Sequence, residues 1–180
     1  MRIINVPNDE NFIRRVAEVL LDGFTASGIN PLKNLTEAVE EVRESLGENR
    51  ISRAALDADE KVVGWIAGFH EYALVWELHP LVVRRDRQHR GIGSALVRDF
   101  ENQVKSRGGL TVRLGTDDEN NRTSLGGVDL YGDALGKLQR IENLQEHPFE
   151  FCQKLGYEIT GAIPDANGFG KPDIIMCKRV

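Results

Sequence analysis

The sequence is poor in cysteine and has no long apolar run. Its 180 residues include only two cysteines, Cys152 and Cys177, which stand far apart without the spacing of a metal site. We therefore expect neither a bound metal nor a structural disulfide. No stretch approaches the roughly 20 apolar residues of a membrane helix, and residues 1–10 are polar, unlike a signal peptide. These absences predict a cytoplasmic protein without a membrane partner.

The sequence also lacks an excess of basic residues. Its formal net charge is −5, whereas a nucleic-acid-binding protein needs a basic face to neutralise phosphates. No nucleic-acid partner is therefore expected, and the acidic balance is compatible with a small cationic substrate. The 41% hydrophobic content is typical of a globular protein, and the length suits one domain over residues 1–180.

Periodicity predicts an α/β domain with a mixed sheet. Apolar residues recur at helical spacing in residues 12–24, 35–46 and 92–104, and helices are also expected at 130–141 and 148–155. Asn34, with Glu37 three residues later, resembles a capping box, and Gly47 is expected to end that helix in a left-handed conformation. Strands are expected at residues 2–6, 51–56, 62–69, 75–83, 111–116, 157–163 and 173–178.

A glycine-bearing segment lies between the strand 75–83 and the helix that follows. Residues Gln88, His89, Arg90, Gly91, Ile92 and Gly93 have the form Q-x-x-G-x-G. The first N–H groups of a helix have no internal partner, and glycine lets a ligand approach the backbone closely. The pattern is typical of a pyrophosphate site, although a glycine-rich turn without a ligand explains so short a motif about as well.

This strand, loop and helix resemble the acetyl-CoA site of the GNAT family of N-acetyltransferases, and the predicted order of elements matches that family. The resemblance implies a twisted, mostly antiparallel sheet of six to seven strands flanked by helices. It implies that acetyl-CoA is the cosubstrate. It also implies that pantetheine and pyrophosphate are held by Val82, Val83, Gln88, His89, Arg90, Gly91, Ile92, Gly93 and Ser94.

Four further stretches narrow the resemblance. They are residues 76–83 (WELHPLVV), 107–118 (RGGLTVRLGTDD), 146–157 (EHPFEFCQKLGY) and 166–174 (ANGFGKPDI). Together they resemble the chromosomal aminoglycoside 6'-N-acetyltransferases of Gram-positive bacteria, over residue 75 to the carboxyl terminus. The resemblance implies a primary amine as substrate, namely the 6'-amino group of an aminoglycoside, and a homodimer.

The same resemblance implies roles for residues of strand 75–83. Glu77 and His79 would contribute to the acceptor site, and the backbone N–H of Leu81 would lie near the thioester. A carboxylate at Glu77 can bind an ammonium and relay its proton, and histidine's usual pKa of about 6.5 suits proton transfer. A solvated carboxylate and a histidine bound to a backbone carbonyl are the alternatives.

Asp117 and Asp118 follow the strand 111–116, in the region where α/β sheets place ligands. Paired carboxylates there favour binding of a cationic substrate, and an ordinary solvated turn is the alternative. His70 and His147 are expected to be structural.

Cys152 departs from the resembled family, which usually has tyrosine there as an acid for the departing CoA thiolate. A thiol with its usual pKa of about 8.5 can protonate another thiolate at little cost in free energy. A small buried hydrophobic residue on a helix is the alternative, and we favour it. Acetylation of polyamines, other small amines or protein amino groups remains open, as does a CoA-binding module without catalysis.

Overall fold

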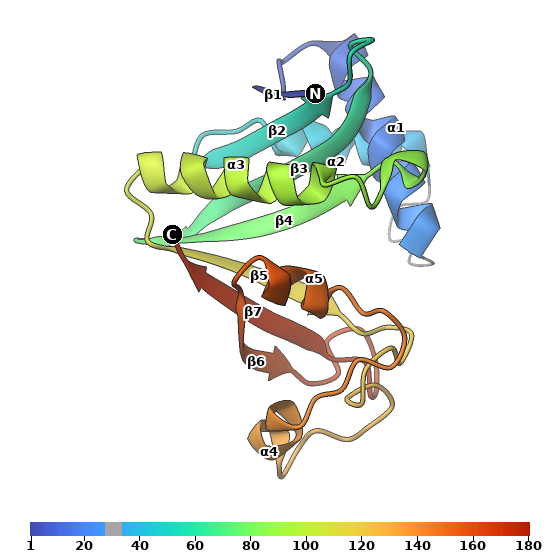
Figure 1. Ribbon diagram of the computed structural model, residues 1–180, viewed down its shortest axis with the longest axis vertical. Coiled ribbons are helices and arrows are strands. Elements are labelled where there is room, and N and C mark those ends of the chain that lie inside the picture. The colour runs from blue at the N-terminus through green and yellow to red at the C-terminus, as the bar shows by residue number, and fades with distance from the viewer. Residues whose placement is uncertain (28–33) are drawn as a thin grey trace. The chain divides into compact units, whose positions relative to one another are not determined.

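The chain folds into two compact units. The computed structural model describes residues 1–27 and 34–180. Unit 1 comprises residues 1–112 together with Val180, and unit 2 comprises Arg113–Arg179. Figure 1 labels the helices and strands of both units. No helix in the described residues is long and apolar enough to cross a membrane.

Unit 1 begins with a strand and two helices, continues with three strands, and ends with a short turn of 3-10 helix and a long helix. The elements are β1 (Arg2–Asn5), α1 (Glu10–Ser27), α2 (Leu35–Glu44), β2 (Arg50–Leu56), β3 (Val62–Tyr72), β4 (Val75–Val83), η1 (Arg85–Arg87) and α3 (Ile92–Ser106). Asn34 caps α2, since its Oδ1 accepts a hydrogen bond from the Glu37 N–H at 3.1 Å. This contact confirms the cap that the sequence predicts.

The strands of unit 1 pair in the order β1-β2-β3-β4, and every pair is antiparallel. The turn between β2 and β3 is closed by Asp57, whose N–H bonds the carbonyl of Lys61 at 3.0 Å. The Asp57 carboxylate also accepts bonds from the N–H groups of Asp59 and Lys61. An aspartate can thus mimic a backbone turn, and the strands expected at residues 51–56 and 62–69 form a β-hairpin.

Strand β3 turns its two faces toward different helices because successive side chains in a strand alternate. Trp65 and Ala67 join the buried cluster formed with α1 and α2. On the other face, a Cβ at Gly64 would lie 3.0 Å from Leu96, and one at Gly68 would lie 2.5 Å from Phe100. Glycine on β3 therefore lets α3 pack close to the sheet, and α3 crosses the strands in Figure 1.

Unit 2 contains most of β5 (Thr111–Asp117), followed by α4 (Ala134–Gln139), α5 (Phe149–Lys154), β6 (Glu158–Ile163) and β7 (Asp173–Arg179). Its strands lie in the order β5-β7-β6, and β6 and β7 are antiparallel. The largest side chains buried completely in this unit are Leu125, Leu130, Ile174 and Met176.

The observed elements confirm an α/β fold with seven mostly antiparallel strands flanked by helices in the described residues. Two local expectations differ from the structure, and one short element has no counterpart in the prediction. Helix α4 covers Ala134–Gln139 rather than 130–141, the turn η1 was not expected, and Gly47 has no positive φ. The second helix ends at Glu44, and its C-cap residue, Ser45, has a right-handed conformation. The Ser45 hydroxyl donates to the Val42 carbonyl at 2.6 Å.

Candidate active site

Strand β4 carries an irregularity at the residues expected to be catalytic. Leu81 pairs with Ile66 of β3 and Leu78 pairs with Gly68, so β4 has one more residue than β3 between these pairs. The extra residue lies in the His79–Pro80 segment. Such a β-bulge bends a strand and redirects its side chains, which is why bulges are common beside active sites.

The side chains of β4 differ in exposure around this bulge. His79 is exposed and Glu77 is half-buried, while Leu78 and Pro80 are buried. Leu81 is half-buried and begins the regular pairing that continues through Val82 and Val83. Unit 1 therefore presents a carboxylate and an imidazole on one strand, two residues apart.

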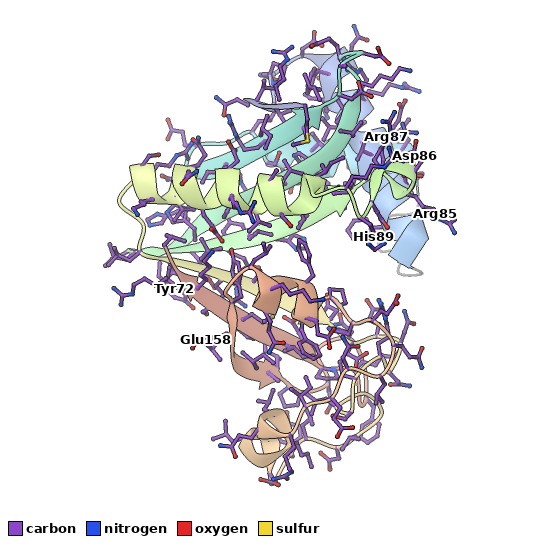
Figure 2. All side chains as sticks on the ribbon, in the orientation of Figure 1. Tyr72, Arg85, Asp86, Arg87, His89 and Glu158 are labelled. Atoms are coloured by element: carbon purple, nitrogen blue, oxygen red, sulfur yellow. The ribbon has the colours of Figure 1, made fainter. Side chains whose placement is uncertain are left out.

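The end of β4 is joined to α3 by η1 and by a loop that we call the phosphate loop, residues 88–94. The side-chain amide of Gln88 donates to the Val83 carbonyl at 3.1 Å and closes the loop onto the strand. The Arg85 N–H donates to Oδ2 of Asp22 on α1 at 2.7 Å. Figure 2 labels Arg85, Asp86, Arg87 and His89 along this turn.

The start of α3 fits an anionic ligand. Its N-cap residue, Gly91, has a φ of 78°, no side chain caps the helix, and its first turn contains no acid. A Cβ at Gly91 would meet no atom within 4 Å, so the space beside this backbone is open. The first N–H groups of the helix and its dipole both favour a bound phosphate. These residues could therefore hold the pyrophosphate of CoA.

The arginines near this loop divide into two groups. Arg84 pairs with Asp86 at 3.2 Å, and Arg87 pairs with Asp57 at 3.4 Å and with Asp86 at 3.5 Å. The hydrogen bond from the Arg84 guanidinium lowers the pKa of the Asp86 carboxyl. Arg85 and Arg90 form no side-chain ion pair within residues 1–27 and 34–180, so their charge is available to a ligand.

The two acids at the end of β5 have different environments. Asp117 is exposed, and its Oδ1 accepts a hydrogen bond from Asn167. Asp118 is completely buried, and its carboxylate accepts bonds from the Arg122 N–H at 2.6 Å, the Thr123 N–H at 3.0 Å and the Thr123 hydroxyl at 2.7 Å. Asp118 thus orders its own loop, and Asp117 faces solvent.

His147 was expected to be structural, and its contacts show how. It is 2% exposed, its Nδ1 accepts from the Phe149 N–H at 3.3 Å, and its Nε2 lies 3.1 Å from the Asp117 carbonyl. Since Nδ1 is the acceptor, Nε2 carries the proton and donates to the carbonyl. Burial lowers the pKa of His147, which stays neutral and joins the start of α5 to the end of β5.

The environment of Cys152 favours the packing interpretation. The side chain is buried on α5, and burial raises the pKa of its thiol to about 12. Proton transfer from such a thiol to a thiolate with the usual pKa of about 8.5 is uphill. The expectation that this transfer costs little is therefore wrong, because burial desolvates the Cys152 thiolate and disfavours its formation.

Comparison with known proteins identifies the family. The sequence profile of the acetyltransferase (GNAT) family matches residues 23–136. The chain belongs to the GNAT family of acetyltransferases. A comparison with curated proteins gave no match. The match confirms the expected fold and the expected enzyme class, an acetyl-CoA-dependent acetyltransferase.

Solved structures of GNAT enzymes are similar to nearly the whole chain. An aminoglycoside 6'-N-acetyltransferase crystallised with coenzyme A is 40% identical, with a TM-score of 0.88, over 99% of this chain and 97% of that one. The aminoglycoside 6'-N-acetyltransferase of Enterococcus faecium is 41% identical, with the same TM-score and coverage. An aminoglycoside 6'-acetyltransferase of type Ii is 35% identical, with a TM-score of 0.73 over the same shares.

Proposed function

We propose that this GNAT enzyme transfers the acetyl group of acetyl-CoA to the 6'-amino group of an aminoglycoside. The observation that carries the proposal is the identity of about 40% to two aminoglycoside 6'-N-acetyltransferases over nearly the full length of each chain. Residues 1–180 would act as a single GNAT domain. We further propose a cytoplasmic homodimer whose activity confers resistance to such antibiotics.

The phosphate loop and the end of β4 would hold the cosubstrate, which supplies an activated thioester. The N–H groups at the start of α3 would bind the pyrophosphate, and Arg90 would add mobile positive charge. The residues assigned to this site are Val82, Val83, Gln88, His89, Arg90, Gly91, Ile92, Gly93 and Ser94. Glycine at 91 and 93 supports the assignment, because backbone contact with a phosphate leaves no room for side chains.

On β4, Glu77 would bind the ammonium form of the acceptor and receive its proton, because only the neutral amine is a nucleophile. His79 would assist this proton transfer from its exposed position at the bulge. The Leu81 N–H would donate to the oxygen on which negative charge develops during the attack. The departing CoA thiolate would take its proton from solvent, because the buried thiol of Cys152 has no part in this scheme.

At the end of β5, Asp117 would contact a cationic group of the acceptor. Its exposure supports this role. Asp118 would act indirectly, because its carboxylate is occupied by hydrogen bonds within the loop. An aminoglycoside carries several ammonium groups, so an anionic surface favours its binding over that of a neutral amine.

Release of CoA thiol with a panel of amines tests the proposed substrate. The panel contains a kanamycin-type aminoglycoside, a polyamine and a peptide with a free amino terminus. Its sharpest member is a matched aminoglycoside with a hydroxyl in place of the 6'-amine. We expect rapid turnover of the 6'-amine and at least a hundredfold lower kcat/KM for the 6'-hydroxyl analogue. Equal rates for the two aminoglycosides, or faster turnover of the polyamine or peptide, would contradict the proposal.

A further inference from the structure

The loop between β6 and β7 makes a side-chain contact with the end of β5. Nδ2 of Asn167, on this loop, donates a hydrogen bond to Oδ1 of the exposed Asp117. We infer that Asn167 is a positioning residue, which fixes the Asp117 carboxylate so that its other oxygen can bind a cationic group of the acceptor. The inference rests on the proposed function and deepens it.

Backbone contacts hold Asn167 in place. Its N–H donates to the Lys171 carbonyl at 3.1 Å, and Oδ1 of Asp165 accepts from the Gly170 N–H at 2.7 Å. The Gly127 N–H donates to the Gly170 carbonyl at 2.7 Å. A Cβ at Gly170, whose φ is 69°, would lie 2.9 Å from the Gly127 Cα. The close contact of these two loops therefore requires glycine, and it limits the movement of Asn167.

The backbone around Asp117 is held as firmly. The Asp117 carbonyl accepts from Nε2 of His147 at 3.1 Å, and the next N–H, that of Asp118, donates to the Pro172 carbonyl at 2.9 Å. With the main chain fixed, rotation of the carboxylate is the freedom that remains. The hydrogen bond from Asn167 removes this rotational freedom, so binding of the acceptor costs less conformational entropy.

The amide of Asn167 is a suitable hydrogen-bond partner for a carboxylate that binds a cationic acceptor. An amide is neutral, so it orients the carboxylate and leaves its negative charge intact, whereas a lysine would cancel the charge. Within the described residues, no lysine or arginine pairs with Asp117. Asp117 therefore presents an oriented, uncompensated carboxylate to solvent, which suits an ammonium group.

A double-mutant cycle of Asn167→Ala and Asp117→Asn tests the inference, with a kanamycin-type aminoglycoside as acceptor. We expect Asn167→Ala to raise the KM of the aminoglycoside about five- to tenfold, as one lost hydrogen bond predicts, with kcat and the KM of acetyl-CoA within about twofold. In the Asp117→Asn background the same substitution should have no further effect. Asn102→Ala, at an exposed position of α3, is the matched control and should change neither KM.

Asn167→Lys provides a second readout that loss of structure cannot imitate. A lysine should pair with Asp117 and cancel its charge, so the KM should rise more for the multiply charged aminoglycoside than for an amino sugar with one ammonium group. Equal increases for both acceptors would overturn the inference. So would additive effects in the double-mutant cycle, or an unchanged KM in Asn167→Ala when Asp117→Asn raises it. If Asp117→Asn itself leaves the acceptor KM unchanged, the proposed role of Asp117 fails instead.

Discussion

Unit 1 presents backbone N–H groups at the start of α3, where Gly91 is the N-cap residue and no side chain caps the helix. Unit 2 presents the Asp117 carboxylate at the end of β5, where it accepts a hydrogen bond from the side chain of Asn167. The first arrangement depends on local sequence, because glycine and a helix start suffice to form it. The second depends on residues up to 50 positions apart, such as Asp117 and Asn167. The proposed anion site would thus be encoded in one short motif, whereas the proposed cation site would need contacts between separate loops.

The largest effect on stability is expected inside unit 2, where Asp118 and Asp117 are adjacent but differ in burial. Asp118→Asn places an amide N–H₂ against buried donors, so it should lower the free energy of unfolding by about 2–3 kcal/mol. Asp117→Asn should change it by less than about 0.5 kcal/mol. Urea denaturation of both variants measures the difference. Equal losses would show that burial does not separate the two carboxylates.

In unit 1, Glu77→Gln keeps the shape of the side chain and removes its charge. A charge-assisted hydrogen bond contributes about 1.5–3 kcal/mol, so kcat/KM for the aminoglycoside should fall roughly ten- to a hundredfold. The Kd of acetyl-CoA should change by less than about twofold. Steady-state kinetics and calorimetry check the two halves. A variant that acetylates every tested amine as well as the parent would leave Glu77 without a role in catalysis.

Gly93→Ala separates ligand binding from folding in the phosphate loop. Gly93 lies in the first turn of α3, where alanine suits the helical backbone, so the variant should keep the fold. Its methyl group should obstruct the backbone approach of the pyrophosphate and raise the Kd of acetyl-CoA about tenfold. Gly91 is less suitable, because its φ of 78° makes any side chain strained. Unchanged affinity in a well-folded Gly93→Ala variant would refute this placement of the pyrophosphate.

The neutral imidazole of His147 should make the stability of the protein depend on pH. Because its folded-state pKa is lowered, the unfolded chain binds the proton more tightly. The contribution of His147 to the free energy of unfolding should be fully present above about pH 6.5, the usual histidine pKa, and should decrease as the pH falls below that value. Urea titrations between pH 7.5 and 5 should show this slope, and His147→Gln should reduce it. His70→Gln, at an exposed position, should retain the slope.

The smallest effect on turnover is expected at Cys152. With a thiol pKa of about 12, this side chain is a poor acid, so Cys152→Ala should leave kcat within about twofold. It should cost about 1 kcal/mol of stability, because it leaves a small cavity. Cys152→Tyr tests the residue that the resembled family has there and should cost more stability by overfilling the site. A large fall in kcat for Cys152→Ala, at preserved stability, would assign the thiol a catalytic role.

The sequence predicts the strands and the long helices well because their patterns are local. The expected strand at residues 75–83 has the observed bounds, and the hairpin at Asp57 follows from turn chemistry. The bulge at His79 arises in the pairing of β4 with β3, and the turn η1 is held by the contact between Arg85 and Asp22. Neither feature could be predicted from the sequence. Tertiary contacts of this kind leave no periodic signal.

The candidate site divides in the same way. The glycine-capped helix start, where we propose the phosphate site, follows from Q-x-x-G-x-G, whereas nothing local distinguishes Asp118 from Asp117. Their difference comes from the N–H groups of Arg122 and Thr123, which the loop directs at one carboxylate. Asn167 carried only the signal of an Asn-Gly turn, which indicates where the chain reverses but not what the amide contacts.

Steady-state KM values for both substrates in Gly93→Ala and Asp117→Asn test the central claim, that the phosphate loop binds the cosubstrate and the end of β5 binds the acceptor. Gly93→Ala should raise the KM of acetyl-CoA about tenfold and leave that of a kanamycin-type aminoglycoside within about twofold. Asp117→Asn should do the reverse, because it removes a charge that only the cationic acceptor needs. Parallel increases in both KM values, in either variant, would contradict the account.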